Sequence, residues 1–478
     1  MADTSAYDNW RALTEKALKG APFESLLTPE IGLTGAEGFV APLAMPAEPI
    51  HAGRAQTGAW TVVQRVDDDA AAGDAVTDLE NGATGLALVF AGAPGADGRG
   101  LTANTVAALD DALAGVRLDL ITLYLEAGAN GSAALALLLA LCERRGEMPR
   151  ALHAGLDPFG AGAFAGAPVD APLAEAVALF GERGIAGTAL CADGRIAAEA
   201  GATPAHELAF ALTSLAAMLK ALDDAGIGPD TALPRISVAL SADADQFATM
   251  AKLRAMRRLH ALIAEACGVD APLHLTATTS ARMLSRSDPH TNLLRLTIAA
   301  MGGALGGADA LTVLPFDGTG APFARRMARN IQNLMLEEAH VARLADPGAG
   351  SGTIETLTDT IAEAAWRLFQ ANGAGDPAWL SDGTFARMAA DGAARERTII
   401  GVTKHAPPEP FRPVRAAPPV PRDGEETAGL ALAALLARAT DGAALRMATP
   451  ETGRGAVRPV RAADAFETST ATSTLAEG

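Results

Sequence analysis

The sequence predicts an α/β protein built on a (β/α)8 barrel, with an N-terminal helix and extended arm and a Pro-rich C-terminal extension. Two observations lead to this fold class. From about residue 82, eight short apolar runs alternate with longer Ala- and Leu-rich segments, most of them long enough for a helix. The runs are continuously apolar, as expected of parallel strands whose outer face is covered. An open doubly wound sheet is the alternative that this pattern leaves open.

The N-terminal 22 residues have the pattern of an amphipathic helix. Trp10, Leu13 and Leu18 recur at helical spacing, and Gly20 followed by Pro22 predicts the end of the helix. Residues 23–60 are rich in Pro and Gly, which favours an extended arm. We therefore assign residues 1–65 to an N-terminal helix and arm.

The predicted barrel occupies residues 66–405. Its apolar runs begin at Leu86, Leu120, Ala151, Ile185, Ile236, Leu273, Leu311 and Ile399. Two of the intervening helices have clear start signals, Thr203 before Pro204 and Asp288 before Pro289, which are the residue types preferred at an N-cap and at the first helical position.

The last 73 residues, 406–478, differ from the predicted barrel in composition and in hydrophobic pattern. Residues 405–426 form a Pro-rich linker, residues 429–448 have a short helical pattern, and the tail is polar and weakly patterned. We assign this segment to a linker and C-terminal tail.

Composition excludes several classes of function. The net charge of -18 disfavours binding to nucleic acid or to an anionic membrane surface. Three widely separated cysteines and no apparent signal peptide predict a cytoplasmic protein without disulfides. The eight histidines form neither HxH nor HxxxH, so we predict no metal site.

The residues that follow the predicted strands are the candidates for chemistry, because barrel enzymes react at the carboxyl ends of their strands. These positions are mostly short acids, small residues and threonines: Glu126, Asp157, Cys191, Asp193, Arg195, Ser241, Asp243, Asp245, Thr278, Thr279, Ser280, Asp317, Thr403, Lys404 and His405. A separate basic group, Lys252, Arg254, Arg257 and Arg258, lies within two helical turns. It predicts either a carboxylate or phosphate site or a solvated helix face.

Several stretches resemble the methylmalonyl-CoA mutase family. They are residues 242–268, 279–317, 323–370 and 397–404, which resemble its barrel domain, and residues 8–27 and 60–66, which resemble the opening of its small subunit. The resemblance covers most of residues 8–405. It implies a TIM barrel, coenzyme A ester chemistry, adenosylcobalamin, and a radical interconversion of methylmalonyl-CoA and succinyl-CoA.

The departures from the family pattern bear on function. Catalytic chains carry a Tyr-His pair before Glu-Ala-Gly-Ala; here that motif begins at Glu199, and the aligned positions are Arg195 and Ile196. Asp157 lies in HAGLDPFGAG, where catalytic chains have Thr-Ile-Gln-Asn-Asp, and Asp317 lies in VLPFDGT, where they have His-Thr-Asn-Ala. The cobalt-binding Asp-x-His-x-x-Gly motif does not occur in this sequence.

The resemblance and these departures lead to one functional prediction. We expect a small, non-catalytic subunit of a heterodimeric methylmalonyl-CoA mutase, without catalytic residues of its own. Its partner would be a homologous large subunit that binds adenosylcobalamin and the acyl-CoA substrate, and the helix and arm of residues 1–65 would contact that partner. The candidate substrate-binding residues are Arg254, Arg257, Thr278 and Asp317.

Two alternatives stay open at this stage. The barrel could be a catalytically competent acyl-CoA mutase that uses a separately encoded cobalamin-binding subunit. It could also be an unrelated lyase that holds a carboxylate with Arg254 and Arg257.

Overall fold

Eight parallel strands close into a barrel in the computed structural model, in the order β1 to β8 with β1 pairing β8. The structure describes residues 4–22, 50–55, 57–70, 72–373, 379, 398–409, 422–447, 457 and 459–464. The strands are β1 (Thr61–Val66), β2 (Gly85–Val89), β3 (Thr122–Glu126), β4 (Ala151–Leu156), β5 (Gly187–Asp193), β6 (Ile236–Ala242), β7 (Leu275–Thr279) and β8 (Ala310–Thr312). The predicted fold class is confirmed.

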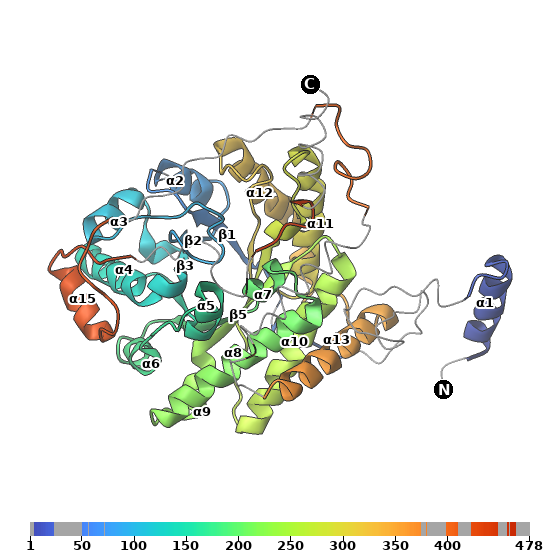
Figure 1. The fold of residues 1–478 in the computed structure, drawn as a ribbon, viewed down its shortest axis with the longest axis horizontal. Coiled ribbons are helices and arrows are strands. Elements are labelled where there is room, and N and C mark those ends of the chain that lie inside the picture. The colour runs from blue at the N-terminus through green and yellow to red at the C-terminus, as the bar shows by residue number, and fades with distance from the viewer. Residues whose placement is uncertain are drawn as a thin grey trace.

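Helices surround the strands on the outside (Figure 1). The described α-helices are α1 (Thr4–Ala17), α2 (Ala72–Glu80), α3 (Val106–Ala112), α4 (Gly131–Arg145), α5 (Pro158–Ala165), α6 (Leu173–Glu182), α7 (Arg195–Glu199), α8 (Pro204–Asp224), α9 (Pro229–Ala232), α10 (Gln246–Cys267), α11 (Pro289–Leu305), α12 (Pro322–Asn333), α13 (Gly352–Ala371) and α15 (Leu432–Thr440). Short 3₁₀ turns include η6 (Ala281–Met283), which follows β7.

The predicted helix starts are confirmed at atomic detail. The hydroxyl of Thr203 accepts a hydrogen bond from the backbone N–H of His206, and Pro204 opens α8. The carboxylate of Asp288 accepts from the backbone N–H of Thr291 in the same way, and Pro289 opens α11. These local signals therefore fixed two of the helices that cover the barrel.

The eighth predicted strand is wrong. The run at Ile399 forms a tight turn in which the N–H of Thr403 donates to the carbonyl of Ile399, at 2.9 Å. The missing strand is β1, of which all but the last residue, Val66, lies in the segment predicted as helix and arm. It was not recognised because it contains polar residues and so is not a continuously apolar run. In the fold these side chains are hydrogen-bonded: Gln64 donates to the carbonyl of Arg325 at 2.9 Å, and Arg65 donates to the carbonyl of Gly95 at 2.8 Å.

The core has two layers. The larger cluster lies between the strands and the surrounding helices, and the smaller one lies inside the barrel around Val63, Ala87, Tyr124 and Ala310. The small side chains of the inner layer leave space at the barrel axis. Among the described residues, α8 is long and apolar enough to cross a membrane, but 72% of that window is buried within the protein, as in a core helix.

The two ends of the chain differ in how they relate to the barrel. The predicted N-terminal helix is present as α1, which lies away from the barrel in Figure 1. Most of the predicted arm lies outside the described residues. The short helical stretch predicted in the C-terminal extension is α15, which packs against α4.

Candidate functional site

A cavity of about 60 Å³ lies inside the barrel. Residues from all eight strands contribute to its wall, among them Tyr124, His153, Cys191, Ser237 and Thr278. Pockets that bind small molecules usually measure roughly 300–1,000 Å³. The cavity is therefore large enough for a few water molecules but far too small for an acyl-CoA.

The side chain of Arg195 spans the part of this cavity nearest the carboxyl ends of the strands. Arg195 is the first residue of α7, directly after β5, and its guanidinium forms a bidentate pair with Asp193 at 2.8 Å for both bonds. The same guanidinium donates to Glu126 of β3 at 2.8 Å and to Thr278 of β7 at 3.0 Å. We call these four residues the Arg195 clamp. It ties together the ends of three strands across the lumen.

Electrostatics explain why the clamp is stable although it is buried. Burial alone would raise the pKa of Glu126, but the positive charges of Arg195 and Arg65 outweigh it and lower that pKa below its ordinary value. Burial opposes the charge on Arg195, but Asp193 and Glu126 outweigh it and raise its pKa. The guanidinium thus makes four hydrogen bonds to side chains of its own chain.

Three stacked rings line another part of the barrel interior. The three rings lie next to one another, with centroid distances of 4.7 Å for Tyr124 and His153, 3.9 Å for His153 and His274, and 6.0 Å for Tyr124 and His274. The Tyr124 hydroxyl lies 3.3 Å from Nε2 of His274. Burial lowers the pKa of both histidines. Neutral imidazoles can stack closely without charge repulsion, so this arrangement is a packed interior layer.

Two buried carboxyl groups cap backbone amides around the barrel mouth. Asp157 accepts from the N–H groups of Gly160 and Asp193 and from the hydroxyl of Ser214, and burial raises its pKa to about 6. Glu199 accepts from the N–H groups at the start of η6, at 3.1 and 2.9 Å, and burial raises its pKa to about 7. Both carboxyl groups therefore hold backbone segments in place around the barrel mouth.

A second cavity, also of about 60 Å³, lies beside the first, and Gly95 lines both. Its wall includes Asp67, which pairs with Arg65 at 3.4 Å and with Arg99 at 2.9 Å. Burial by itself would raise the pKa of Asp67, but the positive charges of these two arginines outweigh that effect and lower the pKa. The carboxyl end of the barrel is therefore crossed by two networks of ion pairs.

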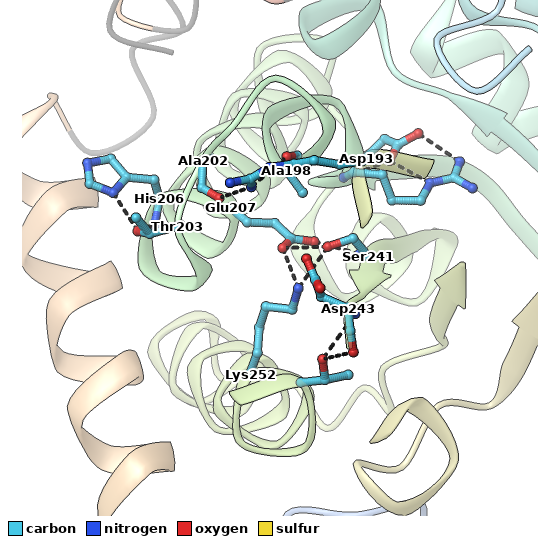
Figure 2. A network of polar contacts seen from close by, with 12 residues as sticks. Asp193, Ala198, Ala202, Thr203, His206, Glu207, Ser241, Asp243 and Lys252 are labelled. Atoms are coloured by element: carbon cyan, nitrogen blue, oxygen red, sulfur yellow. Dashed lines mark hydrogen bonds and ion pairs between the residues drawn. The ribbon is translucent and has the colours of Figure 1, made fainter. Parts of the chain in front are cut away.

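A third buried network lies between the barrel and its helices (Figure 2). Lys252 of α10 donates to the carboxylate of Glu207 and, at 2.8 Å, to the hydroxyl of Ser241 at the end of β6. The N–H and hydroxyl of Ser241 both donate to Glu207, at 2.6 and 2.9 Å. Because neither cavity is lined by Lys252 or Ser241, this network fastens α8 and α10 to β6 and is not a Ser-Lys nucleophile.

The four residues predicted to bind substrate lie in different places. Thr278 is part of the Arg195 clamp, and Asp317 lines the second cavity, where its carboxylate accepts from the N–H of Thr319. Arg254 is fully buried and pairs with Asp346 and Glu355.

Arg257 lies at the opposite end of the barrel from the mouth. It donates to the carbonyl groups of Leu273 and Gly307, just before β7 and β8, and pairs with Asp309 at 2.9 Å. Arg254 and Arg257 thus hold carboxylates of their own chain. A role in substrate binding stays a prediction for all four residues, and the geometry brings only Thr278 into the lumen.

Four residues that line the two cavities were not predicted from the sequence: Arg65, Asp67, Arg99 and Tyr124. The first two could have been predicted if residues 61–66 had been recognised as a strand, because Arg65 and Asp67 lie at its carboxyl end. Arg99 and Tyr124 carry no comparable signal, because their place depends on a loop and on the alternation of side chains within β3. Among the described residues, no group of three or more His, Cys, Asp or Glu is placed to hold a metal ion.

Comparison with known proteins agrees with this architecture. Residues 91–409 match the family described as methylmalonyl-CoA mutase. The methylmalonyl-CoA mutase small subunit of Streptomyces virginiae is 43% identical over 325 residues, which cover 66% of this chain and 51% of that protein. A probable methylmalonyl-CoA mutase small subunit of Mycobacterium tuberculosis is 42% identical over 276 residues, covering 54% of this chain and 44% of that protein.

A large subunit is also similar, at a lower level. The methylmalonyl-CoA mutase large subunit of Porphyromonas gingivalis is 34% identical over 228 residues, covering 44% of this chain and 32% of that protein. The chain thus spans about half the length, or less, of the curated relatives it matches. Because the family match extends over well more than half of the sequence and over most of the barrel, the chain belongs to the methylmalonyl-CoA mutase family.

Proposed function

We propose that this chain is a small, non-catalytic subunit of a heterodimeric, adenosylcobalamin-dependent methylmalonyl-CoA mutase, an isomerase of the cytoplasm. In the proposed complex it stabilises a homologous large subunit, which binds the cofactor and the acyl-CoA. The similarity to proteins named as small subunits supports the assignment to such a complex.

The observation that carries the non-catalytic role is the Arg195 clamp. An acyl-CoA bound inside this barrel would need an open lumen, and here a guanidinium held by Glu126 and Asp193 crosses it. Breaking a buried ion pair of this kind costs roughly 3–5 kcal/mol, since it leaves an uncompensated charge. A substrate would have to displace the clamp at that cost, so the lumen is an unfavourable place for it.

The residues at the barrel mouth do not fit adenosylcobalamin either. Both cavities there measure about 60 Å³, and most of the charged side chains in their walls form ion pairs, as Arg195 does with Glu126 and Asp193 and Arg99 with Asp67. A corrin ring on this face would lie against ion pairs instead of a shaped apolar surface. We therefore place the cofactor on the partner chain and derive no step through it in this barrel.

The test is to express the chain alone and together with a cobalamin-binding large mutase subunit. Each preparation is assayed for conversion of methylmalonyl-CoA to succinyl-CoA with added adenosylcobalamin. We expect a one-to-one complex, turnover only in the complex, and turnover that survives Arg195→Met in the small chain. Turnover by this chain alone would contradict the proposal. So would a loss of turnover in the complex that contains the Arg195→Met small chain, if that complex forms normally.

The same assay separates the proposal from the alternative of a competent barrel with a separate cobalamin-binding subunit. That alternative requires this lumen to hold the acyl-CoA. A cobalamin-binding module without a barrel of its own should then restore turnover to this chain, whereas our proposal predicts none. No feature of the described residues favours the third option, a lyase based on Arg254 and Arg257, because both guanidinium groups have carboxylate partners within the chain.

A further inference from the structure

A short C-terminal segment, residues 459–464, crosses the carboxyl end of the barrel. The N–H of Val460 donates to the carbonyl of Glu199 at 2.7 Å, and the N–H of Ala462 donates to the carbonyl of Arg282 at 2.9 Å. Between them, the guanidinium of Arg461 pairs with Asp97 at 2.7 Å. These three contacts lie in the loops that follow β5, β7 and β2, so the segment joins different sides of the barrel mouth.

The acceptors for this segment are themselves linked. The carboxylate of Glu199 accepts from the N–H groups of Ala281 and Arg282, so the loop after β5 and the turn after β7 are already held together. The segment adds its two backbone hydrogen bonds to that link. Val457, just before the segment, and Ala463, within it, are 1% and 3% exposed, so apolar side chains are buried along with the polar contacts.

The position of Arg461 connects this segment with the second cavity. Its side chain is 15% exposed and forms part of the cavity wall, which also includes Arg65 and Asp67 at the end of β1. Ligands approach barrel enzymes from this end, through the loops that follow the strands. A backbone segment that is hydrogen-bonded across these loops closes that approach.

We infer that residues 459–464 form a strap that holds the carboxyl end of the barrel closed, both to small ligands and to a module docking from another chain. The strap acts independently of the Arg195 clamp, since the two share no residue and no hydrogen bond. It also goes beyond the proposed function, because it predicts that restoring catalytic side chains at positions 195 and 196 leaves the mouth shut.

A cysteine placed beneath the strap tests this inference. Ala96 lines the second cavity, is 3% exposed and precedes Asp97, so Ala96→Cys puts a small thiol where only an open strap admits a reagent. The full-length chain with this substitution, which serves as the reference, is treated with methyl methanethiosulfonate, and the labelling rate of each thiol is followed by peptide mass spectrometry. Cys142, buried in α4 away from the mouth, reports any general loosening of the fold.

Two further substitutions, each added to the reference chain, weaken the strap with little other effect. Arg461→Gln and Asp97→Asn each remove the ion pair, and asparagine tolerates the positive φ of 48° found at position 97. Loss of a partly exposed ion pair shifts an opening equilibrium by about three-fold. The control is Arg446→Gln, which breaks a more exposed C-terminal ion pair, with Glu426, that involves none of the three residues bound by the strap.

We expect slow labelling of the introduced thiol at position 96 in the reference chain, a rise of about three-fold on adding Arg461→Gln or Asp97→Asn, and no change on adding Arg446→Gln. The Cys142 rate should stay constant throughout. The inference is overturned if the introduced thiol in the reference chain reacts as fast as a free thiol or does not respond to either strap substitution. It is equally overturned if the labelling rates of the introduced thiol and of Cys142 rise together.

Discussion

Replacing Arg195 by methionine tests the electrostatic account of the barrel lumen. Methionine keeps much of the length and apolar volume of the side chain but removes the charge and all four hydrogen bonds to Asp193, Glu126 and Thr278. The charged side chains of the clamp are only 14–18% exposed, so water cannot compensate the two carboxylates that lose their partner. We expect the free energy of unfolding to fall by roughly 3–5 kcal/mol at about pH 7.5.

The loss should depend on pH in a defined direction. In the intact chain the pKa of Glu126 is lowered, so its contribution to stability is present above its ordinary pKa and is lost as the pH falls through the lowered value. Without Arg195, burial dominates and favours the protonated carboxyl. The variant is then penalised most at neutral pH, and the difference from the parent should shrink at about pH 5 as Glu126 takes up a proton.

Urea unfolding followed by circular dichroism at about pH 7.5 and about pH 5 measures both effects. Arg117→Met is the matched control, because Arg117 pairs with Asp119 and Glu147 while its side chain is 61% exposed, and its loss should not measurably change stability. Our reasoning would be refuted by an Arg195 variant as stable as the parent. It would also be refuted by an equal loss at the two pH values.

Three further predictions concern other parts of the chain. Arg254→Met should lower the free energy of unfolding by roughly 3–5 kcal/mol, because it breaks buried ion pairs. The control Arg258→Met, which breaks a partly exposed pair, should lower it by less than about 1 kcal/mol, and equal effects in urea unfolding would contradict the assignment of Arg254 to a buried network. Because the pKa of Glu199 is raised to about 7, the native chain binds more protons than the unfolded one between its ordinary pKa and about pH 7, so stability should fall as the pH rises through that window. Between about pH 5 and about pH 8 the parent should lose roughly 2–3 kcal/mol more than Glu199→Gln, and parallel pH profiles would argue against this carboxyl being buried. Burial raises the pKa of the Cys191 thiol, so iodoacetamide at about pH 8 should modify the partly exposed Cys267 well before Cys191, as read by peptide mass spectrometry; the reverse order would mean that the lumen is open.

Much of the fold could be predicted because its signals are local. The seven runs from Leu86 to Leu311 are strands, with starts within about two residues of those predicted, because a strand covered on both faces must be continuously apolar. The caps at Thr203 and Asp288 are likewise local, since a side chain only has to reach an amide three residues away. β1 was not predicted, because Gln64 and Arg65 are polar residues whose hydrogen-bond partners lie far along the chain.

The candidate site could be predicted less well. The rim positions Glu126, Asp193, Arg195 and Thr278 were identified from the strand ends, but not their pairing. Arg254 and Arg257, whose spacing suggested a site for a substrate carboxylate, instead hold Asp346, Glu355 and Asp309 of the same chain. Spacing along a helix shows which charges share a face, but it does not show what lies opposite that face.

The sequence by itself determined that this chain forms a parallel barrel of the mutase type and that tyrosine and histidine are replaced at positions 195 and 196. Only the tertiary structure decided what the replacement does. Arg195 reaches Glu126, 69 residues away, only because closing the barrel brings the ends of β3 and β5 to one rim. Hydrophobic periodicity can be seen in any short stretch of sequence. The partner of a buried charge depends instead on which distant segments lie within hydrogen-bonding distance once the barrel has closed.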